Sequence, residues 1–274
     1  MSLLDAYPTS IRTAPPAQFL VLTIVSIVFL LLGVAWSLVD ARQVVGAAVW
    51  MKPVKFALSF VVFFATIALV EARLSETVRD GWLLRVIAWV MAAAFLSEMA
   101  YMTYQAALAK PSHFNTGTPF HAFMYQAVMA SGAVALVLGA AVIGVIAKRD
   151  RSARLGDGLR TGIFLGFPLT FVLTMVTAGY LSTNGGHFVG LHPEGAAVLP
   201  LLGWSGVTGD LRPAHFAAMH AMQVLPLLGL WLDRRSSGSP TRILWIGSAL
   251  YGGLTMAVFA QALMGMPLLP RGSP

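Results

Sequence analysis

The chain has 274 residues, of which 57% are hydrophobic and only 11% are charged, and its formal net charge at pH 7 is +7. About a quarter of the residues of an ordinary soluble domain are charged, so this composition excludes a water-soluble fold and indicates a membrane protein. The chain has no cysteine, which excludes disulfides, thiolate metal sites and cysteine nucleophiles.

Apolar runs of about 20 residues, the length of helix that crosses a hydrocarbon core, alternate with short polar segments along the chain. They predict an all-α fold, a polytopic integral membrane helix bundle with about seven transmembrane helices in a single domain, 1–274. The spans are expected near 18–39, 53–72, 86–108, 120–147, 161–183, 213–232 and 243–266, with a long outer loop at 184–212. Pro168 and Pro226 fall inside the fifth and sixth spans, where kinks are expected. No internal repeat is evident in the sequence.

Lysine and arginine are distributed unevenly between the two sides of the predicted bundle. Twelve of the 18 lie on the side of the N-terminus: Arg12, Arg73, Arg79, Arg85, Lys148, Arg149, Arg151, Arg154, Arg160, Arg234, Arg235 and Arg242. The other side has Arg42, Lys52, Lys55, Lys110, Arg212 and Arg271. The positive-inside rule therefore predicts the N-terminus in the cytoplasm and the C-terminus outside. Membrane lipid is the expected environment, and the net charge does not require nucleic acid as a partner.

All six histidines are expected on or near the outer face of the membrane. They are His113, His121, His187, His192, His215 and His220. One interpretation is that imidazole, like tyrosine and tryptophan, is comfortable at a membrane interface. The other is that the histidines contribute to a binding site on this side.

Polar side chains inside the spans are biased toward the same side. Glu98, Tyr101 and Gln105 are spaced i, i+3 and i+7, which places them on one face of the third span. A carboxylate at this depth should face protein or water, and Glu98 is expected to pair with Lys55. This pair would be either a buried structural ion pair or part of a ligand or proton site. With Tyr125 and Gln223, these groups predict a polar cavity that opens to the outside and binds a cofactor or small ligand.

Haem b or a transition metal is the leading hypothesis for the cofactor. Either His121 or His215, paired with His220, would ligate haem iron, and the propionates would bind Lys52, Lys55 or Arg212. On a helix, His215 and His220 diverge by about 140°, so the two cannot readily chelate one ion together. The candidates for a metal site are instead His113, His187 and His192.

Two other functional classes fit the sequence. A proton-coupled transporter for a small molecule would use Glu98 and Lys55, and the helices interrupted at Pro168 and Pro226 are typical of such proteins. Against transport, the cytoplasmic halves of the spans are almost purely apolar. An accessory membrane subunit would bind a protein partner through its outer loops. Retinal chemistry is disfavoured because the last span, 243–266, has no lysine. The sequence assigns no catalytic residue.

Three stretches resemble segments of an uncharacterised group of bacterial polytopic membrane proteins. They are Trp50-Met51-Lys52-Pro53-Val54-Lys55-Phe56, Ser112-His113-Phe114-Asn115, and Gly203-Trp204-Ser205 continuing through Gly209-Asp210-Leu211-Arg212 to His220-Ala221-Met222-Gln223. The resemblance implies a multi-pass protein of the bacterial cytoplasmic (inner) membrane, and it brings no activity, cofactor or substrate with it.

Overall fold

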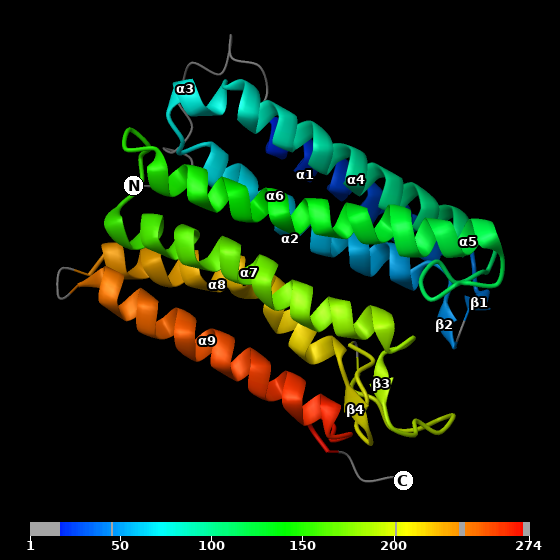
Figure 1. Cartoon of the computed structure of the whole chain (residues 1–274). Helices are drawn as coiled ribbons and strands as arrows, with labels where there is room; N and C mark the ends of the chain where they lie inside the picture. The colour runs from blue at the N-terminus through cyan, green and yellow to red at the C-terminus, as the bar shows by residue number, and fades with distance from the viewer. Residues whose placement is uncertain (1–16, 45, 201, 236–238, 271–274) are drawn as a thin grey trace. The chain divides into compact units, whose positions relative to one another are not determined.

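The computed structural model describes residues 17–44, 46–200, 202–235 and 239–270. Within these ranges the protein is all-α apart from four two-residue strands, and seven helical segments are long and apolar enough to cross a membrane (Figure 1). They are α1 (Gln18–Ser37), α2 (Met51–Glu71), α4 (Trp82–Ala107), a continuous fourth span (Pro119–Arg149), α7 (Asp157–Thr183), α8 (Arg212–Asp233) and α9 (Pro240–Leu263). The predicted all-α bundle of a multi-pass membrane protein is confirmed.

The fourth span combines three helical segments. It begins with α5 (Pro119–Phe123), continues through the π-helical segment η2 (Met124–Met129) and ends with α6 (Ala130–Arg149). Single π-helical turns inside α-helices are rare and are frequent at functional sites. The segment η2 contains Tyr125, one of the predicted site residues.

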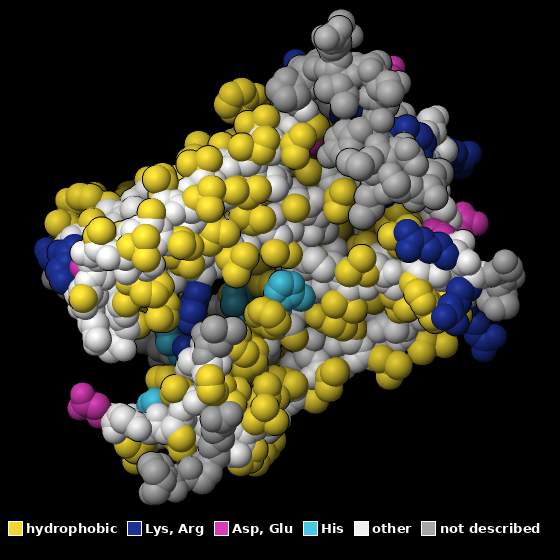
Figure 2. Space-filling model, turned by 180° about the vertical axis from the view of Figure 1, so that it is seen from behind, with side chains coloured by type: hydrophobic (Ala, Val, Ile, Leu, Met, Phe, Trp, Pro, Cys, Tyr) yellow, Lys and Arg dark blue, Asp and Glu magenta, His cyan; other side chains and the backbone are white. Residues whose placement is uncertain are grey.

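The outer surface of the helices is apolar. In Figure 2, hydrophobic side chains cover most of the visible face, and most of the charged side chains on it lie toward the edges. Exposed leucines such as Leu31, Leu32 and Leu250 lie at mid-span positions. An apolar exposed surface of this kind suits lipid rather than water.

The chain forms two compact units. Unit 1 comprises residues 1–139 and 149–154, and unit 2 comprises residues 140–148 and 155–274. Unit 1 contains α1, α2, the short α3 (Glu76–Arg79) and α4, whereas unit 2 contains α7, α8 and α9. The helix α6 contributes residues to both.

Each unit begins with two helices whose connection contains a short antiparallel pair of strands. In unit 1, β1 (Gln43–Val44) pairs antiparallel with β2 (Ala47–Ala48) between α1 and α2. In unit 2, β3 (Phe188–Val189) pairs antiparallel with β4 (Gly209–Asp210) between α7 and α8. We call this end of each unit its hairpin end.

At the opposite end, a carboxylate closes each helix pair in the same way. Glu71, the last residue of α2, accepts hydrogen bonds from the backbone N–H groups of Gln18 and Phe19 at the start of α1, at 3.1 and 3.2 Å. Asp233, the last residue of α8, accepts them from Gly158 and Leu159 at the start of α7, at 2.7 and 2.8 Å. The first N–H groups of a helix have no partner within it, so each carboxylate satisfies two of them. We call this end of each unit its clasp end.

The hairpin end of each unit contains an Asp-x-Arg pair, although the arginine lies well before the Lys52-Pro53 step in unit 1 and directly before Pro213 in unit 2. The backbone N–H and Nε of Arg42 both donate to Oδ1 of Asp40 at 3.0 Å, and Nη2 donates to Oδ2 at 2.7 Å. Arg212 makes the same three contacts with Asp210, at 3.0, 2.9 and 2.6 Å. Hydrogen bonds from Arg42 hold the pKa of Asp40 well below its usual range.

The third helix of each unit ends identically. Lys110 N–H bonds to Gln105 O and Met266 N–H bonds to Gln261 O, at 2.9 and 3.2 Å. The residue before each of these donors, Ala109 or Gly265, has a positive φ, of 52° and 77° respectively. The sequences agree as well, since Lys52-Pro-x-Lys-Phe-Ala matches Arg212-Pro-x-His-Phe-Ala, and Gln105-Ala and Pro111 match Gln261-Ala and Pro267. The structure therefore corrects the sequence reading that no repeat exists: α1–α2–α4 and α7–α8–α9 are two copies of one three-helix motif.

Candidate ligand and proton site

A row of three buried polar side chains follows one face of α4. The exposed fractions of Glu98, Tyr101 and Gln105 are 5%, 6% and 0%. Their spacing places them on one side of the helix, from mid-span toward the hairpin end of unit 1. These are three of the residues that the sequence predicts for a ligand or proton site.

The polar atoms of this row have no hydrogen-bond partner among the described residues. They are Oε1 of Glu98, the hydroxyl of Tyr101, and both Oε1 and Nε2 of Gln105. A buried polar atom without a partner costs about 1–3 kcal/mol, and each such atom in a native structure calls for an explanation, for example a ligand or an ion. The row is therefore suited to receive a polar molecule or a proton.

Glu98 lies against the fourth span within unit 1. A Cβ atom placed on Gly132 would lie 3.2 Å from Oε1 of Glu98, so the absence of a side chain at Gly132 gives the carboxyl group its space. The expected pair with Lys55 is not formed. Glu98 takes part in no salt bridge with any described residue, and Lys55 is exposed. Lys55 lies near the start of α2, whereas Glu98 lies in the middle of α4, so the depths of the two groups differ.

An aromatic group lies at the hairpin end of unit 1. The ring of His113 packs between Phe56 and Tyr125, with centroid distances of 5.5 and 5.8 Å. Lys52 is half-buried, and its Nζ lies 5.9 Å from the centroid of Phe56. We call Phe56, His113 and Tyr125 the aromatic cluster. Two of the predicted site residues, Lys52 and Tyr125, are thus joined through Phe56 and His113.

Hydroxyl groups hold the histidines of unit 1. Nδ1 of His113 lies 3.1 Å from Oγ of Ser112, and Nδ1 of His121 lies 2.7 Å from Oγ1 of Thr118. Thr118 also caps α5 by accepting a hydrogen bond from the backbone N–H of His121 at 3.2 Å. The sequence did not predict Ser112 and Thr118 as the partners of these histidines, although each lies within three residues of its histidine.

The histidines of α8 have separate partners. Nδ1 of His215 lies 3.4 Å from Oγ1 of Thr177 on α7, and Nδ1 of His220 lies 3.2 Å from Oε1 of Gln223. The ring of His220 also packs on Phe216, with centroids 4.2 Å apart. His215 and His220 therefore do not act together as a pair, as their spacing on the helix predicts.

Arg212, a predicted propionate partner, is occupied within the loop of unit 2. Besides Asp210, its guanidinium donates to the carbonyl of Gly203 at 2.6 Å and lies 5.3 Å from the ring centroid of Phe188. The ring of His192 stacks on Phe188 with centroids 3.8 Å apart. These contacts fold the loop over the start of α8 and give Arg212 a structural role.

The structure offers no support for a metal centre. Among the described residues, no three His, Asp or Glu side chains lie close enough together to hold a metal ion. The rings of His187 and His192 each pack against Phe188, which lies between them in the sequence. His113 belongs to unit 1 and contributes to the aromatic cluster instead.

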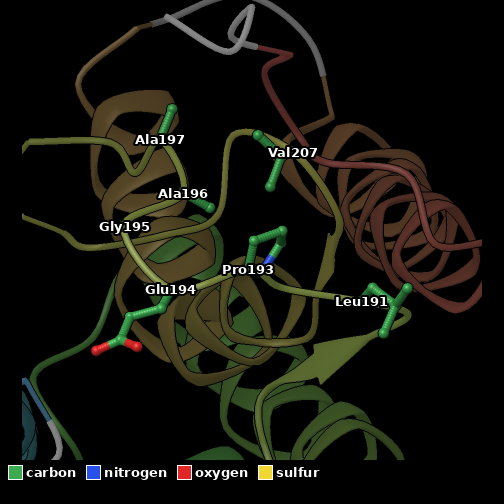
Figure 3. A pocket seen from close by; sticks show the side chains of 7 residues that line it. All are labelled: Leu191, Pro193, Glu194, Gly195, Ala196, Ala197 and Val207. Atoms are coloured by element: carbon green, nitrogen blue, oxygen red, sulfur yellow. The ribbon is translucent and has the colours of Figure 1, made fainter.

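Two cavities lie within unit 2. The loop forms an open pocket of about 330 Å³, which is lined by Leu191, Pro193, Glu194, Gly195, Ala196, Ala197 and Val207. In Figure 3 the carboxylate of Glu194 points away from the other labelled side chains. A second cavity of about 230 Å³ lies between α8, α9 and the loop, and Phe216, Tyr251 and Leu254 are among its lining residues. Neither brings several polar groups together, so neither resembles a catalytic site.

Comparison with known proteins identifies no relative. No family model matches the chain, and no match was found among curated proteins or solved structures.

Proposed function

We propose that the protein is a carrier that moves a small molecule across the membrane together with a proton, and that Glu98 is the group that binds the proton. The observation that carries this proposal is the buried carboxyl group of Glu98, whose Oε1 has no partner among the described residues. Ionisable side chains inside membrane spans are costly and are most often found on substrate and proton pathways.

The second copy of the motif supports a functional role for Glu98. Leu254 lies seven residues before Gln261, as Glu98 lies seven residues before Gln105. The helix α9 nevertheless ends with the same hydrogen bonds as α4. The motif therefore folds without a carboxyl group at this position, which argues against a purely structural role.

The repeat itself is typical of carriers. Because α1 and α7 are the first and fifth of seven spans, both copies cross the membrane in the same direction. Parallel repeats of this kind occur in secondary transporters. The positive-inside rule predicts the N-terminus in the cytoplasm; the hairpin ends then face the outside of a bacterial inner membrane, and the buried polar row on α4 runs from mid-span toward that side.

Proton movement in proteoliposomes tests this proposal. Vesicles loaded with a pH-sensitive dye receive, in turn, small carboxylates, small amines and neutral polyols. We expect at least one class to move protons in the wild type, and Glu98→Gln and Glu98→Leu to abolish the movement. Glu98→Leu copies the residue of the second motif, and circular dichroism checks that the variant keeps its helical fold. Ser97→Ala, an exposed neighbour on α4, is the control. Absence of proton movement with every class, or wild-type rates in Glu98→Gln, overturns the proposal.

A haem or metal redox protein is the second candidate. The hydrogen bonds at Nδ1 of His215 and His220 would orient Nε2 as a ligand, as is common for histidines that bind metals. An absorption spectrum with elemental analysis of the purified protein separates the two candidates. A Soret band or about one equivalent of metal that is lost in His220→Ala favours the redox protein, whereas a colourless, metal-free protein excludes it.

A further inference from the structure

We infer that the molecule carried is a small organic carboxylate with an apolar tail, and that Lys52 binds its carboxylate group together with donors from Gln105 and Tyr101. This inference rests on the proposed carrier function and names the substrate class of the same site. It is carried by charge, by unsatisfied hydrogen-bond donors and by the rings that surround them.

Lys52 is a positive charge with no counter-charge among the described residues. It is half-buried, and it forms no salt bridge with a described residue. It also lies in the first turn of α2, where no acidic residue is present. The positive end of the helix dipole adds to the charge of the ammonium group at this position. A half-buried charge is costly unless it is paired, so an anion is the ligand that this position favours.

The side-chain amide of Gln105 is available as a donor because Asn115 occupies the carbonyl group that it would otherwise bind. In unit 2, Nε2 of Gln261 donates to the carbonyl of Pro267 at 2.8 Å. The equivalent carbonyl in unit 1, that of Pro111, instead accepts a hydrogen bond from Nδ2 of Asn115 at 2.9 Å. Within the described part of the chain, Gln105 therefore keeps an amide donor with no partner, and the hydroxyl of Tyr101 is a second such donor on the same helix face.

The chain connects these donors with Lys52 at the hairpin end of unit 1. The carbonyl of Gln105 accepts from Lys110 at the end of α4, and the chain continues directly to His113. The ring of His113 packs on Phe56, and Phe56 also contacts Lys52. Lys52 at the start of α2, and Tyr101 and Gln105 in the last two turns of α4, therefore all lie in the hairpin-end half of unit 1.

The number and type of donors favour a carboxylate over a phosphate. One ammonium group, one amide and one phenol match the acceptor sites of a single carboxylate. A phosphate dianion is usually bound by arginine forks or by several cations, and among the described residues Lys52 is the half-buried basic residue at this end of the unit, whereas Lys55 and Lys110 are exposed. The aromatic cluster of Phe56, His113 and Tyr125 provides an apolar surface for the remainder of the molecule.

Charge balance links this site with Glu98. A carboxylate that binds Lys52 brings one negative charge, and a proton that binds the carboxylate of Glu98 brings one positive charge. Seven residues of helix separate Glu98 from Gln105, about 10 Å, so both can be bound at once. The loaded protein then carries the same net charge as the empty one, and no covalent bond is made or broken.

Binding measurements on the purified full-length protein test the inference. Acetate, butyrate and benzoate are compared with their amides, and inorganic phosphate is added as a separate probe. We expect carboxylates to bind more tightly than the amides, and Lys52→Met to weaken carboxylate binding by about tenfold or more. Lys52→Arg should restore part of the affinity. Lys110→Met, which removes an exposed charge at the same end of the unit, is the matched control and should bind as the wild type does.

The outcomes separate this inference from the carrier proposal. Equal affinity for carboxylates and amides, tighter binding of phosphate, or equal effects of Lys52→Met and Lys110→Met overturns the carboxylate site. Proton-coupled movement of amines or polyols without carboxylate binding overturns the site and leaves the carrier intact. Carboxylate binding that depends on Lys52 but moves no protons in vesicles supports the site and overturns the carrier.

Discussion

The carboxylate of Glu71 connects the end of α2 with the start of α1, and its replacement by glutamine tests how much this clasp stabilises unit 1. The side chain is only 1% exposed, and its two oxygens accept from two different backbone N–H groups. Because both oxygens act as acceptors, the geometry suits the ionised form. A negative charge at the start of α1 also interacts favourably with the helix dipole.

The expected loss of stability in Glu71→Gln arises because glutamine cannot accept hydrogen bonds from both backbone N–H groups. Glu71→Gln keeps the shape of the side chain, but its amide has one acceptor, and its NH₂ group faces the second backbone donor. A hydrogen bond to a charged group contributes about 1.5–3 kcal/mol, and a buried unsatisfied donor costs about 1–3 kcal/mol. Because relaxation recovers part of this sum, we expect the free energy of unfolding to fall by about 2–4 kcal/mol.

Reversible unfolding in mixed detergent micelles, followed by circular dichroism, measures this change. Glu76→Gln removes an exposed carboxylate in the first turn of α3 and should change the free energy by less than about 0.5 kcal/mol. Asp233→Asn, the equivalent change in unit 2, should cost less than Glu71→Gln because Asp233 is exposed and water can replace the lost contact. A Glu71→Gln protein as stable as the Glu76→Gln control refutes the reasoning.

Two further predictions use matched pairs of substitutions, both read out by the same unfolding assay. Ala109 and Gly265 occupy equivalent left-handed positions at the ends of α4 and α9, so Ala109→Gly should stabilise by about 1 kcal/mol, and Gly265→Ala should destabilise by about 1–2 kcal/mol. Opposite signs would contradict the equivalence. In α7, a Cβ atom added at Gly162 would collide with the carbonyl oxygen of Leu225. A Cβ atom added at Gly179, on the same helix, would have no atom within 4 Å among the described residues. Gly162→Ala should therefore destabilise by about 1–3 kcal/mol, and Gly179→Ala should be neutral or slightly stabilising.

The fold class could be predicted because hydropathy acts locally. Each span is recognisable from its own run of apolar residues, without knowledge of the others. The polar row was also predictable, because the spacing of Glu98, Tyr101 and Gln105 fixes one helix face. The burial of these three side chains could not be predicted, because it depends on neighbours from other helices, such as Gly132, and the sequence does not show which helices pack together.

The repeat was missed because few of its residues are identical. What the two copies share is geometry: a carboxylate that reaches a backbone about 50 or 75 residues earlier in the chain, and a helix end with a left-handed residue. Glu71 and Asp233 differ in residue type and in their distance from Pro53 and Pro213. A sequence alignment therefore does not pair them. The Glu98–Lys55 pair failed for a related reason, since opposite charges in a sequence do not reveal their depths.

Duplication separates structural from functional polar groups in this protein. The clasp carboxylates occur in both copies and make satisfied hydrogen bonds in both, as expected of groups that the motif needs in order to fold. Glu98 occurs in one copy only, where Oε1 has no partner in the part of the chain that the structure describes, and Leu254 replaces it in the other. Because an unsatisfied buried group lowers stability, it persists only where something other than the fold selects it. The polar row of α4 is therefore the part of this bundle in which to look for its ligand.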